Sequence, residues 1–142
     1  MKSPFPPFSR SVTIGAMRDL AVGDVFRWER TFTLEDVQAF ARVSHDEGAH
    51  HILPDAEGRL LVHGLLVATL PTKVGGELNL LARDMLFTFL RPVFTGDHIR
   101  CEVEVAETEP LSDRVNVSLA ISCRNQHDKQ VMIGTCRGVI RR

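Results

Sequence analysis

The sequence contains no hydrophobic run long enough to cross a membrane. Its longest apolar stretch, Leu65–Leu70, falls far short of the roughly 20 residues that a membrane-spanning helix needs. The first ten residues carry three prolines and two phenylalanines, without the apolar core of a signal peptide. We therefore expect a cytoplasmic protein that has no membrane partner.

Cysteine is scarce, and its spacing excludes two classes of site. The three cysteines form no CxxC pair, so neither a disulfide framework nor a thiolate zinc site is indicated. Cys101, Cys123 and Cys136 each fall in a stretch with strand periodicity. We expect small, buried side chains in a reducing compartment.

Charge of neither sign is in excess. The formal net charge is −1, and no basic residues cluster on one element, which excludes the positive stripe of a nucleic-acid-binding protein. With 142 residues, of which 44 % are apolar, the chain suits a single globular domain. We place this domain at residues 16–142, after an extended N-terminal arm at residues 1–15, where proline disfavours a backbone ladder.

The first half of the domain combines one strand with two helices. Residues 25–32 are predicted to form a strand, and Thr33 begins a capping box for an amphipathic helix over residues 34–43. Residues 44–60 break the pattern and predict a loop. Residues 62–74 are apolar nearly all round, which predicts a buried helix, kinked at Pro71 and ended by Gly75-Gly76.

The second half alternates with period two, as strands do. Residues 85–90 are apolar on both sides and predict a strand buried on both faces, and three further strands follow at residues 99–105, 115–123 and 130–140. The fold class is therefore α+β, a single domain with an antiparallel sheet wrapped around a central buried helix. A two-fold dimer would pair the open sheet edges.

One segment, Ser44–His51, concentrates residues that hold or move protons. Five of its eight residues are histidine or acidic, in a predicted loop, where functional side chains commonly lie. A solvated loop without function is an open alternative, since loops are usually polar. A metal site is a lesser one, because the order His-Asp-Glu-x-x-His misses HExxH by one position and Gly48 disfavours a helix.

Several motifs, taken in order, resemble the MaoC-like, R-specific enoyl-thioester hydratases. Their pattern S-G-D-x-N-P-x-H is similar to Ser44-His45-Asp46 followed by His51 at the family spacing. Their H-G pair is similar to His63-Gly64, and P-V-x-x-G-D to the segment from Pro92 to Asp97. The resemblance covers the chain from about residue 20 to the C-terminus. It implies a hot-dog fold in a homodimer or a dimer of dimers.

The resemblance also implies a reaction and the residues that perform it. Asp46 and His51 would be the catalytic pair that adds water reversibly to a trans-2-enoyl thioester of CoA or acyl-carrier protein, without a cofactor or a metal. Gly64 would offer its backbone N–H to the thioester carbonyl, and Thr72 would lie near the substrate. Thr72 could equally be an ordinary helical threonine that bonds back to its own helix. His63 would be a structural hydrogen-bonding residue.

The chain departs from the family pattern in the same segment. Gly48-Ala49 stands where relatives have Asn-Pro, His45 replaces a glycine, and the span from His51 to His63 is shorter than in typical relatives. His45 and His50 are therefore alternative proton carriers. Lys73, Arg83 and Arg91 are candidate contacts for the phosphates of CoA, with an ordinary solvated surface charge as the alternative for each.

Two other functions stay open at this point. A thioesterase or a FabZ-like dehydratase of the same fold usually carries a carboxylate on the central helix, whereas residues 62–74 contain no Asp or Glu. The loss of Asn-Pro would also suit a non-catalytic subunit that binds acyl thioesters.

Overall fold

The computed structural model describes residues 20–142; the predicted arm at residues 1–15 lies outside them. The elements along the chain are β1 (Val25–Thr31), α1 (Leu34–Ser44), α2 (Ala49–Ile52), α3 (Gly64–Val67), α4 (Thr69–Glu77), β2 (Leu80–Phe89), β3 (His98–Pro110), β4 (Arg114–Arg124) and β5 (Gln130–Arg141). Within this part of the chain, no helix combines the length and apolar character that a membrane span requires.

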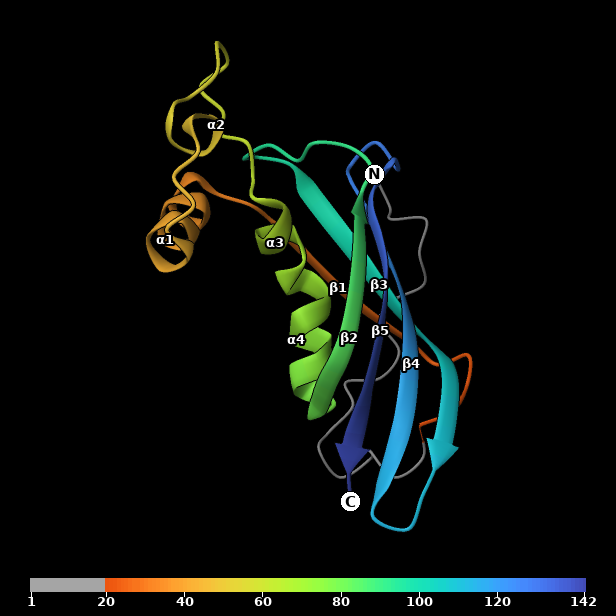
Figure 1. Ribbon diagram of the computed structural model, residues 1–142. Helices are drawn as coiled ribbons and strands as arrows, with labels where there is room; N and C mark the ends of the chain where they lie inside the picture. The colour runs from red at the N-terminus through yellow and green to blue at the C-terminus, as the bar shows by residue number, and fades with distance from the viewer. Residues whose placement is uncertain (1–19) are drawn as a thin grey trace.

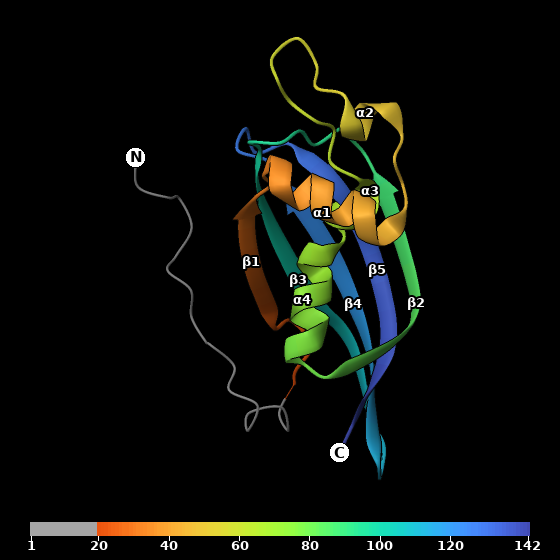
Figure 2. The ribbon, with the colours of Figure 1, turned by 90° about the vertical axis from the view of Figure 1, so that its left-hand side faces the viewer.

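All five strands join one antiparallel sheet in the order β1-β3-β4-β5-β2. The last three strands follow one another as a meander, while β1 and β2 form the two edges. Helices α3 and α4 lie end to end along one face of this curved sheet (Figure 1). The view turned by 90° shows α4 crossing in front of the central strands, with α1 beyond its N-terminal end (Figure 2). This confirms the predicted α+β architecture.

The core lies between the helices and the concave face of the sheet. Alternate residues of β3 and β4 are buried there against Leu70 and Val74 of α4, which are almost fully covered. Cys101, Cys123 and Cys136 are buried free thiols, as the sequence predicts. Cys101 and Cys123 are cross-strand partners, and the hydrogen bond to Cys123, together with burial, raises the pKa of the Cys101 thiol.

Helix α1 begins and ends with the caps that its sequence favours. The Thr33 hydroxyl accepts a hydrogen bond from the Asp36 N–H (3.1 Å), and the Asp36 carboxylate accepts one from the Thr33 N–H (2.9 Å). This is the predicted capping box. The helix ends where His45 takes the left-handed conformation (φ 61°) and its N–H bonds to the Ala41 carbonyl. The cap turns the chain sharply into the segment that holds Asp46.

The central helix is interrupted near Pro71, as predicted, but its end differs from the prediction. The interruption lies at Ala68, within one turn before Pro71, which has no N–H to donate to the Val67 carbonyl. The helix then continues through Gly75-Gly76 to Glu77, so the expected glycine stop is wrong. Both glycines have room and ordinary helical conformation, and burial of Val74 and Leu78 holds the last turn in place.

The loop and the strand that border the site also differ from expectation. Residues 44–60 contain the short helix α2, whose N-cap is Gly48, so this glycine starts a helical turn instead of preventing one. Strand β2 is not buried on both faces. It is a sheet edge, and its apolar side chains Leu81, Met85, Leu86 and Phe89 are each at least half exposed.

Candidate active site

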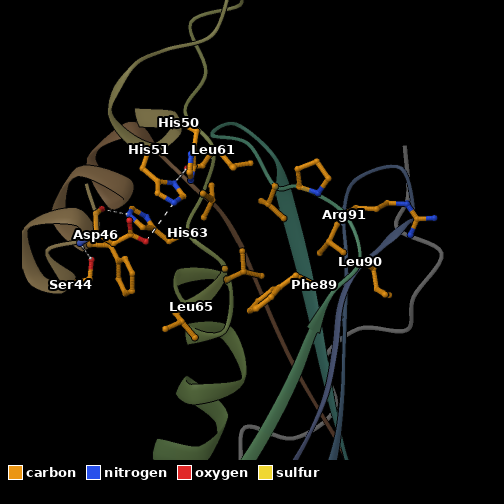
Figure 3. A pocket seen from close by; sticks show the side chains of 17 residues that line it. Ser44, Asp46, His50, His51, Leu61, His63, Leu65, Phe89, Leu90 and Arg91 are labelled. Atoms are coloured by element: carbon orange, nitrogen blue, oxygen red, sulfur yellow. Dashed lines mark hydrogen bonds and ion pairs between the residues drawn. The ribbon is translucent and has the colours of Figure 1, made fainter. Parts of the chain in front are cut away.

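A cavity of about 650 Å³ opens at the N-terminal end of the central helix. The loop between α1 and α2 forms one side, and the end of β2 with the following segment forms the other. Figure 3 shows Asp46, His51 and His63 turned toward one another on the first side, with Phe89 and Leu90 across the cavity. Most of the lining is apolar: Phe40, Leu61, Val62, Leu65, Val67, Phe89, Leu90, Pro92, Val93 and Val131.

Asp46 is held by its neighbours while its carboxylate stays accessible. Its backbone N–H donates to the Ser44 hydroxyl (3.0 Å), and its Oδ1 accepts a hydrogen bond from the Gly48 N–H (3.2 Å). These contacts form a tight local turn after α1. The other oxygen, Oδ2, faces the cavity, and 56 % of the side chain is exposed. Asp46 can therefore exchange protons with a small molecule in the cavity.

His51 lies on α2 and is almost completely buried. Its Nδ1 is 2.6 Å from the Leu61 carbonyl oxygen, and since a carbonyl only accepts, Nδ1 must carry the proton. The second nitrogen, Nε2, is thereby left to face Asp46, with 3.8 Å between Nε2 and Oδ2. This separation exceeds a direct hydrogen bond. It leaves both groups able to bind one small polar molecule beside them.

His63 and Gly64 complete this end of the cavity. His63 Nε2 lies 2.9 Å from the Asp46 backbone oxygen, and its ring stacks on His51 at 3.7 Å between centroids. Gly64 opens α3, where helix geometry leaves the first backbone N–H groups without intrahelical acceptors. A Cβ on Gly64 would lie 2.9 Å from the Phe89 ring, so only a glycine leaves space for a small molecule to reach these N–H groups.

The structure distinguishes the three histidines that the sequence offers as partners of Asp46. His45 caps α1, is exposed and does not line the cavity. His50 lines it and meets the His51 ring edge-on at 4.0 Å. Of the three, His51 has a nitrogen directed at Asp46, which favours it over His45 and His50 as the partner of the carboxylate.

A metal ion fits this group of side chains poorly. Asp46, His51 and His63 each offer one atom within 4.8 Å of the others. However, the two imidazole planes are nearly parallel, at 17°, so their in-plane lone pairs run side by side and do not converge on a point. The absence of a metal stays a prediction, and the ring geometry favours it.

Thr72 lies apart from the other predicted site residues. Its side chain donates a hydrogen bond to the Ala68 carbonyl (2.9 Å), the ordinary helical alternative raised by the sequence. It lines a second, apolar cavity of about 270 Å³ further along α4, together with Gly75, Phe87 and Cys136. The structure thus brings Asp46, His51 and Gly64 together but places Thr72 further along the same helix.

Of the three basic candidates for phosphate contacts, one borders the main cavity. Arg91 lines it and donates to the Gln130 carbonyl at 2.5 Å. Lys73 instead pairs with Glu77 and lies over the Trp28 ring, at 4.0 Å. Arg83 belongs to a polar hollow lined by β2, β3, β4 and β5 residues.

Three features of the site had no signal in the sequence. Phe40 contacts the His63 ring, the Leu61 carbonyl fixes the His51 proton, and Phe89 closes on Gly64. The sequence pattern indicates only that Phe40 and Phe89 are core positions of a helix and a strand. The role of a backbone carbonyl as an acceptor cannot be predicted from residue types.

No family model matches the sequence, but comparisons with known proteins find similar chains. The chain is 31 % identical over 121 residues to the mitochondrial 3-hydroxyacyl-acyl-carrier-protein dehydratase of Arabidopsis thaliana, covering 80 % of this chain and 73 % of the relative. It is 32 % identical over 108 residues to the (R)-specific enoyl-CoA hydratase of Aeromonas caviae, covering 67 % and 80 %.

A solved structure extends the similarity to three dimensions. The unliganded R-hydratase of Pseudomonas aeruginosa has a TM-score of 0.77 to this chain at 26 % identity, covering 88 % of this chain and 84 % of that one.

Proposed function

Since the chain belongs to the MaoC-like family of (R)-specific enoyl-CoA hydratases and 3-hydroxyacyl-acyl-carrier-protein dehydratases, we propose that it adds water reversibly to a trans-2-enoyl thioester. The observation that carries the proposal is the facing pair of Asp46 Oδ2 and His51 Nε2, 3.8 Å apart at an apolar cavity. Such a pair supplies the base and the acid that water addition requires.

In the hydration direction Asp46 acts as the base. Its accessible carboxylate takes one proton from the water as the water oxygen forms a bond to C3 of the substrate. His51 acts as the acid, and because its Nδ1–H is held by the Leu61 carbonyl, the proton for C2 comes from Nε2 of the imidazolium. The pair ends as neutral Asp46 and neutral His51, and transfer of the proton back to His51 resets it.

Gly64 stabilises the charge that develops on the thioester oxygen. Its N–H at the start of α3 is free of an intrahelical acceptor, and the missing Cβ lets the carbonyl approach. The Phe89 ring on the other side of Gly64 limits where the thioester can lie.

The acyl chain extends along the apolar lining toward the second cavity beside Thr72. In this proposal Thr72 contacts the distal part of a long chain, because its hydroxyl is bonded to its own helix and far along α4 from Gly64. The carrier, CoA or acyl-carrier protein, enters past Arg91, the one arginine or lysine among the described residues that line the main cavity. The cytoplasmic location stays a prediction.

We further propose a homodimer formed along β2. An edge strand presents unpaired backbone groups, and proteins usually protect such edges with charge. Edge β1 is protected in this way by Arg27, Glu29 and Arg30, whereas β2 is largely apolar and half exposed. A second copy that pairs with β2 would cover it, and a dimer of dimers stays a prediction.

The test is a spectrophotometric assay of purified protein with short, medium and branched 2-enoyl-CoA esters. We expect loss of the enoyl absorbance and formation of the (R)-3-hydroxyacyl product, with His51→Ala at least about 100-fold slower, since a lost acid or base typically costs 10²–10⁴-fold. No turnover on any enoyl thioester, with folded protein, would overturn the proposal.

The two alternatives predict different results in the same assay. A thioesterase would release free CoA from saturated acyl-CoA. The central helix extends beyond its predicted end and so includes one carboxylate, Glu77. This side chain is paired with Lys73 and lines neither the main cavity nor the one beside Thr72, which argues against thioesterase activity. A non-catalytic subunit would bind acyl-CoA tightly without turnover, unaffected by His51→Ala.

A further inference from the structure

We propose that His63 is a positioning residue that holds Asp46 and His51 in the geometry for proton transfer and stays neutral throughout; this inference rests on the proposed hydratase function. Its ring is 2 % exposed, and it lies between the two proposed catalytic side chains and the proposed carbonyl donor Gly64. His63 hydrogen-bonds the backbone of Asp46, stacks on the ring of His51 and directly precedes Gly64 in the chain.

The first contact fixes the loop that carries Asp46. His63 Nε2 lies 2.9 Å from the Asp46 backbone oxygen, and since that oxygen can only accept, Nε2 carries the proton. The bond ties the turn after α1 directly to the start of α3. Among the described residues, the other hydrogen bonds of Asp46 are exposed local ones, from its N–H to Ser44 and from the Gly48 N–H to its carboxylate, so the His63 bond is the one that reaches the central helix.

The second contact fixes the plane of the His51 ring. The two imidazoles stack at 3.7 Å with 17° between their planes, and Phe40 packs against His63 at 4.8 Å. The Leu61 carbonyl holds His51 at one point, Nδ1, about which the ring could still swing. The stack removes this freedom, so His51 Nε2 keeps facing Asp46.

The remaining nitrogen of His63 indicates its charge state. Nδ1 is buried and has no hydrogen-bond partner among the described residues. A second proton there would bury a donor without an acceptor, and it would place a positive charge against the His51 imidazolium that the mechanism needs. Neutral His63, with its proton on Nε2, satisfies both constraints. His63 therefore orients the pair without exchanging protons with substrate.

Two variants separate the two contacts. His63→Gln keeps an amide N–H near the Nε2 position but loses the stack, whereas His63→Phe keeps a ring but loses the donor. We expect each to lower kcat about 10- to 100-fold with KM changed less than about threefold, because misplacement by about 1 Å can cost 100-fold. His127→Gln is the matched control, since His127 is exposed in the β4–β5 turn. Its backbone N–H, which the substitution leaves unchanged, donates to the Asn125 side chain.

The pH profile distinguishes positioning from mere loss of stability. The titratable groups that face His51 in the described chain are Asp46, His50 and His63. When the stack is lost, His51 Nε2 and the Asp46 carboxylate no longer keep one fixed geometry for proton transfer, so the shape of the kcat–pH profile should differ from that of the wild type. A purely structural defect would lower activity by the same factor at every pH.

Nitrogen NMR of the wild-type imidazoles provides a readout that needs neither activity nor a variant. We expect His63 to show a protonated Nε2 and an unprotonated Nδ1 from pH 6 to 8. A charged His63, or the opposite tautomer, overturns the proposal, as do active His63 variants with the wild-type pH profile. An inactive wild type whose His63 has the expected tautomer contradicts the hydratase function instead.

Discussion

At the scale of single residues, both the proposed chemistry and the packing require position 64 to be a glycine. Its N–H is the proposed donor to the thioester oxygen, and a Cβ there would lie 2.9 Å from two atoms of the Phe89 ring. The ring belongs to a half-exposed side chain at the sheet edge, so it can turn away at small cost to the fold. What cannot be kept is the close approach of the substrate carbonyl.

We therefore predict that Gly64→Ala loses activity more than stability. kcat should fall at least about tenfold, toward the 10²–10³-fold loss seen when an oxyanion donor is removed. The midpoint of urea unfolding should change little. Steady-state kinetics and urea titration measure the two effects, and unchanged kcat would show that Gly64 is not beside the reacting carbonyl.

Single residues also show which parts of the site could be predicted from the sequence. That Asp46, His51 and Gly64 line one cavity was predictable because the short motifs that hold them have distinctive order and spacing. The choice between His45, His50 and His51 was not, because it depends on a left-handed cap at His45 and on the Leu61 carbonyl. These are three-dimensional contacts that residue types alone do not specify.

At the scale of elements, a capping box fixes the start of α1, the helix that leads into the loop carrying Asp46. Partial burial by itself would raise the pKa of Asp36, but the Thr33 N–H, the Arg30 guanidinium and the Thr33 hydroxyl together hold it below its usual value. An ionised Asp36 thus stabilises the fold. This stabilisation is complete above about pH 3.9, the pKa of an unfolded aspartate, and is lost as pH falls through the lower folded pKa.

Asp36→Asn should therefore destabilise the protein in a pH-dependent way. Near neutral pH we expect a loss of about 1 kcal/mol, typical of a helix cap. The difference from wild type should narrow below pH 4. Urea unfolding between pH 3 and 7 measures it, and a difference that is constant over this range would contradict the account.

The pairing of β2 with β5 depends on a glycine. A Cβ on Gly138 would lie 2.4 Å from the Leu81 backbone oxygen, closer than any side chain can tolerate. We predict that Gly138→Ala destabilises the fold by about 1–3 kcal/mol, the usual cost of overpacking. Gly76→Ala is the control, because nothing lies within 4 Å of its Cβ position. Equal urea midpoints for the two variants would count against this close packing.

The element scale explains why most of the fold, but not all of it, was predictable. Alternation along β3, β4 and β5 and the capping box of α1 are local signals, and each prediction was confirmed. The edge position of β2 and the continuation of α4 through Gly75-Gly76 depend on contacts with other parts of the chain. Sheet order makes β2 an edge, and burial of Val74 and Leu78 extends α4 past two glycines.

At the scale of the whole molecule, the exposed apolar edge predicts association. Leu86 is 66 % exposed on β2, and a charge there should prevent pairing with a second copy. Light scattering after gel filtration should give twice the 15.9 kDa chain mass for wild type and the single mass for Leu86→Glu. Val43→Glu, on α1 and 80 % exposed, should leave the mass unchanged. A monomeric wild type would refute the proposed dimer.

The whole account depends on one carboxylate, and its removal is the most direct test. Asp46→Asn keeps the shape and the Oδ1 bond from Gly48 but cannot take a proton from water. Glu47→Gln changes the next residue, which is exposed, and serves as the matched control. We predict that kcat for hydration of a 2-enoyl-CoA falls at least about 100-fold in Asp46→Asn and stays near wild type in Glu47→Gln. Hydration at the wild-type rate by folded Asp46→Asn would contradict the account.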